Sequence, residues 1–283
     1  MKRKNKRILP LVSFLLIILI GWTLWGNTAL EVNEYEIVSD RIPQGFDGFR
    51  IAQVSDLHNA EFGENNSKLI ELLSQTDPDI IVLTGDLIDS RQTDIDIALT
   101  FAREALKIAP VYYVSGNHEA RVRKYEDLKM GLSEEGVIVL ENQIVEITRE
   151  EESITLMGIE DPSFREDYLF GDAESVARQA IEDIQNESDG YKILLSHRPE
   201  LFDLYVETEM DLVFSGHAHG GQFRLPFIGG LVAPNQGFFP EYDAGLFSEG
   251  ITNMIVSRGV GNSIIPVRFN NRPEIIVVEL KKY

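Results

Sequence analysis

Short apolar runs that alternate with helical patterns are the feature that most constrains how this chain can fold. Arg50–Val54, Ile80–Thr84 and Val111–Ser115 predict buried strands, and the apolar spacing of Asn65–Gln75 and Asp94–Ile108 between them predicts amphipathic helices. Strands that alternate with helices favour a layered core of sheets and helices. The chain is therefore expected to have an α/β fold.

The second half of the chain continues with further strands and one more amphipathic helix, at Asp172–Gln185. The strands are expected at Val137–Leu140, Gln143–Thr148, Ser153–Ile159, Tyr191–Leu195, Leu212–Phe214, Ile251–Ser257 and Glu274–Leu280. No linker divides this region, so residues 49–283 are expected to form one domain. Residues 27–48 predict a connector with one edge strand, Tyr35–Ser39.

The N-terminal residues have the charge pattern of a membrane segment. Five basic residues stand before Ile8, and residues 8–30 contain no charge, which is about the length that a helix needs to cross a bilayer. Because basic flanks stay in the cytoplasm, the chain after this segment should lie outside. We therefore expect a cytoplasmic segment at residues 1–7 and a transmembrane anchor or uncleaved signal at residues 8–26.

The alternative for this segment is a cleaved signal peptide, which would make the protein a secreted one. No Ala-x-Ala-like cleavage site stands near Asn27–Leu30, so the anchored form is favoured. That form is a single-pass protein of the cell membrane, with its N terminus inside and the catalytic domain extracytoplasmic.

Charge and cysteine content exclude several kinds of partner and site. Residues 31–283 carry a net charge of about −25, which repels a nucleic-acid backbone, so no nucleic-acid partner is expected. The chain has no cysteine, which excludes disulfides, thiolate zinc sites and cysteine nucleophiles. Nothing in the sequence indicates an oligomeric state.

Polar residues cluster directly after five of the expected strands, where ligands bind in α/β sheets. All five histidines of the chain lie in these clusters, whereas structural histidines would scatter along the sequence. The clusters are Ser55-Asp56-Leu57-His58, Gly85-Asp86-Leu87-Ile88-Asp89, Gly116-Asn117-His118-Glu119, Ser196-His197-Arg198-Pro199 and Ser215-Gly216-His217-Ala218-His219.

The spacing within these clusters favours metal binding. In an extended backbone, residues two apart point the same way, so Asp56 with His58, and His217 with His219, should each be able to hold one ion. Mixed carboxylate and imidazole ligands suit Mn, Fe, Zn or Ni better than Ca or Mg.

The order of these motifs resembles that of the calcineurin-like metallophosphoesterases, over about residues 48–283. The motifs are Asp-x-His, Gly-Asp-x-x-Asp, Gly-Asn-His-Glu, a His-x-Pro-like triplet and Gly-His-x-His. His219-Gly220-Gly221-Gln222 resembles the Gly-His-x-His-Gly-Gly-Gln motif of a membrane-associated bacterial branch. The resemblance implies a two-layer mixed β-sandwich flanked by helices, with the site at one edge.

The resemblance also implies two divalent metal ions, of which Mn, Fe, Zn and Ni remain open. By motif, Asp56, His58 and His219 would hold the first ion, whereas Asn117, His197 and His217 would hold the second, and Asp86 would bridge both. His118 would act at the leaving oxygen, and Asp89 would orient its ring. Glu119 stands where many relatives have Asp and is not a ligand.

These expectations combine into one function. The chain would be a membrane-anchored, extracytoplasmic phosphoesterase with two metals, in which a hydroxide that bridges the metals hydrolyses a phosphoester or pyrophosphate bond. The substrate would be lipid-linked or an envelope component. The alternative is a catalytically weak envelope protein of the same fold that binds metal or phosphate. The pattern does not separate monoesterase, diesterase and pyrophosphatase activity.

Overall fold

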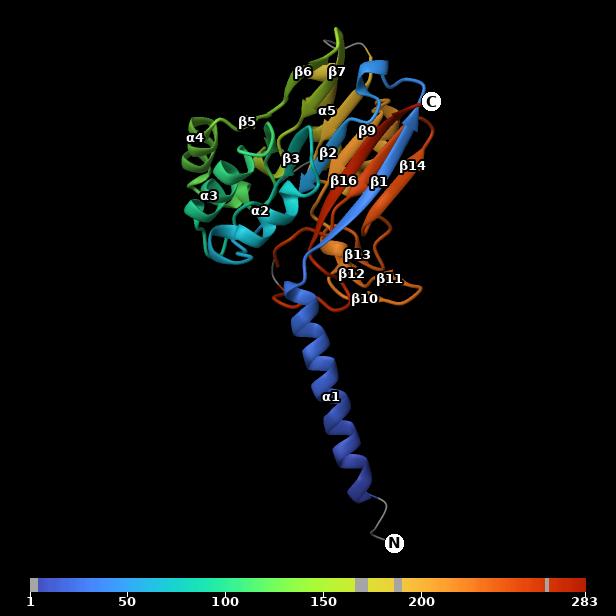
Figure 1. Cartoon of the computed structure of the whole chain (residues 1–283). Coiled ribbons are helices and arrows are strands. Elements are labelled where there is room, and N and C mark those ends of the chain that lie inside the picture. Colours follow the sequence, from blue (N-terminus) through green and yellow to red (C-terminus); the bar gives the residue numbers. More distant parts are fainter. Residues whose placement is uncertain (1–4, 166–172, 186–189, 263–264) are drawn as a thin grey trace.

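The computed structural model describes residues 5–165, 173–185, 190–262 and 265–283 (Figure 1). Two mixed six-stranded sheets pack face to face, and helices cover their outer faces. This arrangement confirms the predicted α/β sandwich flanked by helices. Residues 1–4 of the expected basic segment lie outside the described residues.

The first sheet has the strand order β1-β16-β2-β3-β4-β5. Neighbouring strands are parallel except for β16 and β2, which run antiparallel. The strands are β1 (Glu31–Ser39), β16 (Glu274–Lys282), β2 (Arg50–Val54), β3 (Ile80–Thr84), β4 (Val111–Val114) and β5 (Ile138–Val139). The predicted edge strand is thus β1, which begins four residues before Tyr35 and pairs with the C-terminal strand.

The second sheet has the strand order β14-β15-β9-β8-β7-β6, in which only the two edge strands run antiparallel to their neighbours. Its strands are β14 (Gly245–Glu249), β15 (Thr252–Val256), β9 (Leu212–Ser215), β8 (Lys192–Leu195), β7 (Glu152–Gly158) and β6 (Gln143–Arg149). Two short hairpins follow β9, and the sequence did not predict them. They are β10 (Arg224–Leu225) with β11 (Gly229–Gly230), and β12 (Val232–Ala233) with β13 (Gly237–Phe238).

The central strands are apolar throughout because both of their faces are buried. Along β3, Ile80 and Val82 belong to the core between the two sheets, whereas Ile81 and Leu83 face the helices, as the two-residue period of a strand requires. A third cluster lies between the second sheet and its helices and includes Ile181 and Phe202.

Within the described residues, five α-helices cover the sandwich. Those on the first sheet are α2 (Ser67–Ser74), α3 (Ile95–Ala105) and α4 (Tyr125–Glu135), and those on the second are α5 (Ala173–Gln185) and α6 (Phe202–Glu207). The carboxylate of Asp94 accepts the Asp96 N–H and fixes the start of α3, whereas Gly136 ends α4 in the left-handed conformation.

The N-terminal helix α1 (Asn5–Thr28) projects away from the domain (Figure 1). Pro10–Thr28 is long and apolar enough to cross a membrane, a property that signal sequences share. The last turn of α1 is attached to the domain: the Asn27 side chain donates to the Arg268 carbonyl at 2.8 Å and accepts the Arg268 N–H at 2.8 Å. The guanidinium of Arg272 lies 4.9 Å from the centre of the Trp25 ring.

Candidate metal centre

The site lies at the edge where the carboxyl ends of β2, β3, β4, β8 and β9 meet. Contacts across this edge join the two sheets: Gln53 of β2 donates to the Ser215 carbonyl of β9 at 2.8 Å, and the His217 N–H after β9 donates to the Asp56 carboxylate after β2 at 3.2 Å. All seven expected ligands are buried there: Asp56, His58, Asp86, Asn117, His197, His217 and His219.

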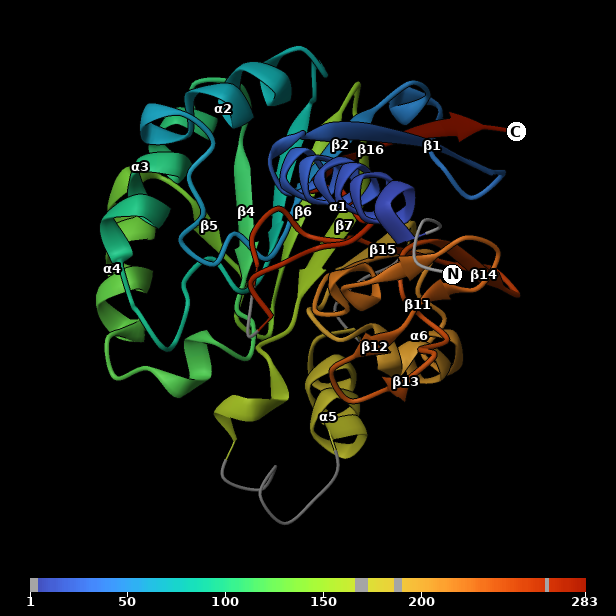
Figure 2. The same ribbon diagram turned by 90° about the horizontal axis from the view of Figure 1, so that it is seen from below.

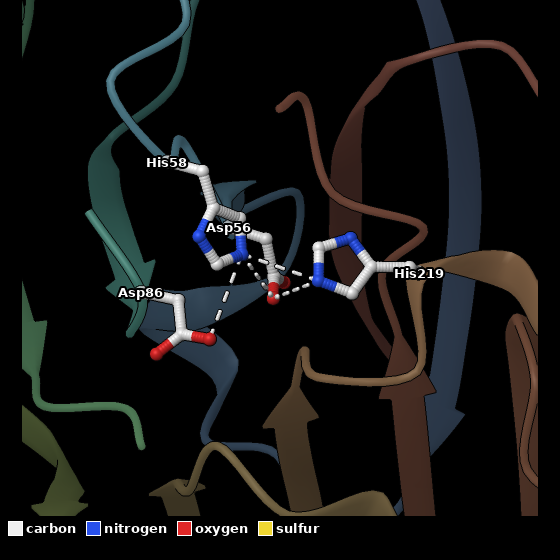
Figure 3. A group of neighbouring side chains, drawn as sticks. All are labelled: Asp56, His58, Asp86 and His219. Atoms are coloured by element: carbon white, nitrogen blue, oxygen red, sulfur yellow. Dashed lines mark hydrogen bonds and ion pairs between the residues drawn. The ribbon is translucent and has the colours of Figure 1, made fainter. Parts of the chain in front are cut away.

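Four of these side chains form a first group, composed of Asp56, His58, Asp86 and His219 (Figure 3). One donor atom from each lies within 4.8 Å of the others. The Nε2 atoms of His58 and His219 face each other at 3.2 Å, and the His219 Nε2 lies 3.3 Å from Asp56 Oδ1. Such converging lone pairs and carboxylates are the surroundings that a cation requires.

A second group consists of Asp86, His197 and His217, with donor atoms again within 4.8 Å of one another. Asp86 belongs to both groups: its Oδ2 lies 3.3 Å from His197 Nε2 and 3.6 Å from His58 Nε2. Among the residues that the structure describes, Asn117 Oδ1 and His197 Nε2 are buried without a hydrogen-bond partner. Buried polar atoms rarely stay unpaired, so these two donors fit a second metal ion.

Five of the seven residues have a positive φ, which side chains other than glycine seldom adopt. The values are 53° for Asp56, 46° for His58, 53° for Asp86, 66° for His217 and 48° for His219. The predicted reason for the convergence of each Asp-x-His or His-x-His pair, an extended backbone, is therefore wrong. Left-handed turns after the strands aim these side chains, and such turns concentrate at functional sites.

Hydrogen bonds fix several of these groups before any ion binds. The Asp56 carboxylate accepts from Ser55 Oγ at 2.6 Å and from the His217 N–H at 3.2 Å. The Nδ1 atom of His197 donates to the Thr84 carbonyl at 2.7 Å, which directs its Nε2 at the Asp86 carboxylate. Oriented ligands of this kind are typical of metal sites.

Two glycines allow the ligand turns to approach each other. A Cβ on Gly116 would lie 2.3 Å from Asp86 Oδ1, and a Cβ on Gly216 would lie 2.1 Å from Ser55 Oγ. Either contact would displace a group that belongs to the site, so only glycine fits at both positions.

Glu119 joins the turns of the site, a role that the sequence did not reveal. Its buried carboxylate accepts the backbone N–H groups of Asp86 and Gly116, both at 2.8 Å, and that of Ile88 at 3.2 Å. Burial and the charge of Asp86 raise the pKa of Glu119 to about 7. The Gly-Asn-His-Glu spacing was the available signal, because it places a carboxylate two residues after Asn117.

The charges of the site favour a bound cation. Burial opposes ionisation of Asp86, but the neighbouring imidazole of His197 outweighs it and holds the pKa of Asp86 well below its usual range. Burial lowers the pKa of His219 to about 3 and that of His217 well below its usual value. The imidazoles of His217 and His219 are thus neutral. Burial opposes protonation of His197, but the charge of Asp86 raises the pKa of His197 to about 10, so a divalent metal would replace a proton on this ring beside the ionised carboxylates.

His118 and Asp89 lie beside the first group, and their donor atoms are within 4.8 Å of His58 and of each other. The Ser90 N–H donates to Nδ1 of the His118 ring at 3.0 Å. The Asp89 carboxylate binds the guanidinium of Arg91, at 2.6 Å from Nη2 and 3.0 Å from Nε. The expected role of Asp89 in orienting the His118 ring stays a prediction.

Arg198 is buried beside His217, a member of the second group. Its guanidinium donates to both oxygens of Asp161, at 2.6 and 2.9 Å, and its Nη1 lies 3.3 Å from His217 Nε2. This bidentate pair holds the arginine behind the His217 ring, so Arg198 is built into the wall of the site.

A cavity of about 460 Å³ opens beside the first group. Its lining residues are His58, Asn59, Asp89, Arg91, Gln92, Asn262 and Pro266. The cavity reaches the first group at His58.

Sequence comparison finds the calcineurin-like phosphoesterase family over residues 49–221. An uncharacterized metallophosphoesterase of Bacillus subtilis (strain 168), YkuE, is 31% identical over 89% of this chain and 86% of its own length. The phosphodiesterase YaeI of Escherichia coli (strain K12) is 30% identical over 82% of each chain.

A structural comparison supports the same fold. The protein TT1561 of Thermus thermophilus superposes with a TM-score of 0.51 at 16% identity, over 75% of this chain and 90% of that one. At this identity the likeness concerns the fold alone.

Proposed function

The chain belongs to the calcineurin-like phosphoesterase family, and from that premise we propose that it is a membrane-anchored phosphodiesterase with two metal ions and an extracytoplasmic catalytic domain. Its class is that of the metal-dependent phosphoric ester hydrolases. The diesterase assignment follows YaeI of Escherichia coli, which is named a phosphodiesterase.

The observation that carries the proposal is the pair of ligand groups that share Asp86. Asp56, His58 and His219 would hold the first ion, and Asn117, His197 and His217 the second, with Asp86 between them. When bound, two divalent ions supply Lewis acidity, which neutralises phosphate charge and lowers the pKa of water. Mn, Fe, Zn and Ni suit this donor set.

His118 would serve the leaving group. Because the Ser90 N–H donates to its Nδ1, the neutral ring carries its proton on Nε2. That N–H would donate to the oxygen on which negative charge develops as the P–O bond breaks. Asp89 and Arg91 line the same cavity, where the carboxylate keeps the guanidinium in place.

The location rests on α1 and on charge. The helix candidate Pro10–Thr28 follows a basic N-terminal segment, which favours an inside N terminus and an outside domain. Some relatives are themselves membrane proteins: a transmembrane protein with a metallophosphoesterase domain from Danio rerio is 29% identical over 89% of this chain and 57% of its own length. An anchored active site favours lipid-linked or envelope phosphoesters as substrates.

The test of the activity is a substrate panel on the full chain in detergent, with each metal in turn. Bis-nitrophenyl phosphate, nitrophenyl phosphate and a phospholipid diester separate diesterase from monoesterase activity. Asp86→Asn should abolish most turnover, because a neutral amide cannot balance two cations, whereas exposed Asp96→Asn should leave it unchanged. Near-normal turnover of Asp86→Asn with full metal content would reject the proposed site. Metal binding without turnover of any ester by the unaltered chain would indicate a binding protein instead.

The location has its own test. Protease added to spheroplasts should degrade the domain, and sequencing of the membrane-bound form should still begin at Met1 or Lys2. A mature start near Leu30 in a soluble fraction would show that the segment is a cleaved signal, and a fully protected domain would reject export.

A further inference from the structure

The hairpins after β9 expose large apolar side chains in an uncharged stretch. Residues 225–240 contain no Asp, Glu, Lys or Arg. Phe227 is fully exposed at the turn of the first hairpin, and Phe238 and Phe239 are 81% and 64% exposed at the second. Together with Ile228, which is 60% exposed, we call these side chains the apolar tips.

Backbone conformation makes these residues unusual. Phe227 and Phe239 have φ values of 68° and 56°. Glycine or asparagine adopts this region at low cost, whereas a bulky aromatic residue does so at a cost in stability. Two phenylalanines that are exposed and also strained contribute little to the stability of the domain. Their side chains therefore need a role outside its core.

The apolar tips lie at the end of the domain from which α1 leaves. Figure 1 shows β10–β13 beside the base of α1, and Figure 2 shows β11 and β12 on the same side of the domain as α1. The contacts agree: the Arg224 N–H in β10 donates to the Phe269 carbonyl at 2.9 Å, and the neighbouring Arg268 backbone binds Asn27 of α1.

The mouth of the metal site opens at this same end. Asn262 and Pro266 line the cavity beside His58. From the same loop, Ile265 and Val267 are 36% and 39% exposed. One end of the molecule thus carries the candidate membrane helix, the apolar tips and the entrance to the site.

We propose that the apolar tips insert into the surface of the bilayer that α1 spans, and that they hold the mouth of the metal site at the depth of the lipid headgroups. The substrate class is then an amphiphile whose phosphodiester lies at that depth while its acyl chains stay in the bilayer. This inference rests on the proposed anchor and activity. The occupant is a bilayer rather than a second copy of the chain, because the surface is continuous with the helix that the same bilayer would cover. Since residues 225–240 are uncharged, insertion should not require anionic lipid.

The absence of cysteine permits a direct test on the full chain. Single variants Phe227→Cys and Phe238→Cys would carry an environment-sensitive fluorophore in phosphatidylcholine vesicles that contain doxyl-labelled lipid. Ile17→Cys in α1 is the positive control, and Ile251→Cys is the matched negative control. Ile251 is an apolar residue, 46% exposed, in the turn before β15, at the opposite end from the site.

Quenching at positions 227 and 238 and at 17, but not at 251, supports the inference. Quenching at 17 alone overturns it while the anchor stands. The fluorophores at 227 and 238 could instead report an apolar environment only when many protein molecules share a vesicle, and without quenching by doxyl lipid. That result indicates contact with a second copy of the chain, and it also overturns the inference. An unquenched position 17 rejects the anchor and the inference together.

Activity supplies an independent measurement. The triple variant Phe227→Ser/Phe238→Ser/Phe239→Ser should hydrolyse bis-nitrophenyl phosphate at the unaltered rate, because none of these residues belongs to the metal site. Its kcat/KM on a phosphodiester lipid in vesicles should fall about tenfold or more, the factor that about 1.4 kcal/mol of lost surface binding gives. Equal rates on the vesicle substrate would overturn the role of the tips. No hydrolysis of either ester by the unaltered chain would instead reject the proposed function.

Discussion

Glu119→Gln should weaken both the fold and the catalytic site, because one buried carboxylate orders two of the ligand turns. Its Oε2 accepts two N–H groups, from Asp86 and Gly116, and its Oε1 accepts the third, from Ile88. A glutamine keeps one acceptor oxygen, and its amide NH₂ would then face an N–H. At least one buried donor is left unsatisfied.

The expected loss of stability follows from that count. An unsatisfied buried donor costs about 1–3 kcal/mol, which for a domain of this size lowers Tm by about 2–12 °C. The activity should suffer more than the fold. Asp86 and the segment of Asn117 are both held by this carboxylate, and a displacement of about 1 Å at such a group can lower turnover about a hundredfold.

Far-UV circular dichroism is the suitable measure of unfolding, because both tryptophans, Trp22 and Trp25, lie in α1 and do not report on the domain. Exposed Glu134→Gln is the matched control and should leave Tm and turnover unchanged. Glu119→Asp keeps the charge but shortens the reach by one methylene, so it should retain more metal than the glutamine variant. Unaltered Tm, metal content and turnover in Glu119→Gln would refute the reasoning.

Two further predictions concern groups beside the ligands. His118→Ala should lower kcat by about 10²–10⁴ with metal content intact, and less for a nitrophenol than for an alcohol leaving group; equal losses on both would remove its role at the leaving oxygen. Asp161→Asn should cost about 3–5 kcal/mol in urea unfolding, because it removes the bidentate partner of the buried Arg198, whose ion pair with Glu200 is longer, at 3.3 Å. Burial raises the pKa of Asp161, but the charge of Arg198 outweighs burial and lowers this pKa from its usual value of 3.8. The stability that the ion pair contributes is therefore present above pH 3.8 and is lost as the pH falls through the pKa of the folded state. A difference between the two proteins that persists undiminished in stronger acid would contradict the ion-pair explanation.

The sequence predicted the central strands well. β2 and β3 have the expected ranges Arg50–Val54 and Ile80–Thr84, since strands buried on both faces are continuous apolar runs bounded by polar turns. It did not predict α4, because Tyr125–Glu135 is mostly polar and presents only a few apolar side chains to the core. The hairpins β10–β13 were missed for a different reason: strands of two residues are too short to show any alternation.

The proximity of the predicted site residues could be expected from the sequence, but their individual contacts could not. Histidine and aspartate placement after strands identified the residues that now lie in two groups around Asp86. The partners of Glu119 could not be read from the sequence, because they are backbone N–H groups, which every residue carries.

The left-handed conformation of the site residues explains why the two members of each Asp-x-His or His-x-His motif converge, although the backbone between them is not extended. An extended strand would place Asp56 and His58 on one face, but both would then continue along the sheet. Positive φ at each of them turns the chain back on itself directly after β2, which brings both side chains to the sheet edge where Asp86 arrives from β3.

Each residue with a positive φ costs about 1–3 kcal/mol, so the turns persist only because surrounding contacts determine them. The Asp56 N–H binds the Gly85 carbonyl at 3.0 Å, and the His58 N–H binds the Asp86 carbonyl at 3.0 Å. The strain in one turn is therefore held by the backbone of the next, which couples the two halves of the candidate metal site that follow β2 and β3.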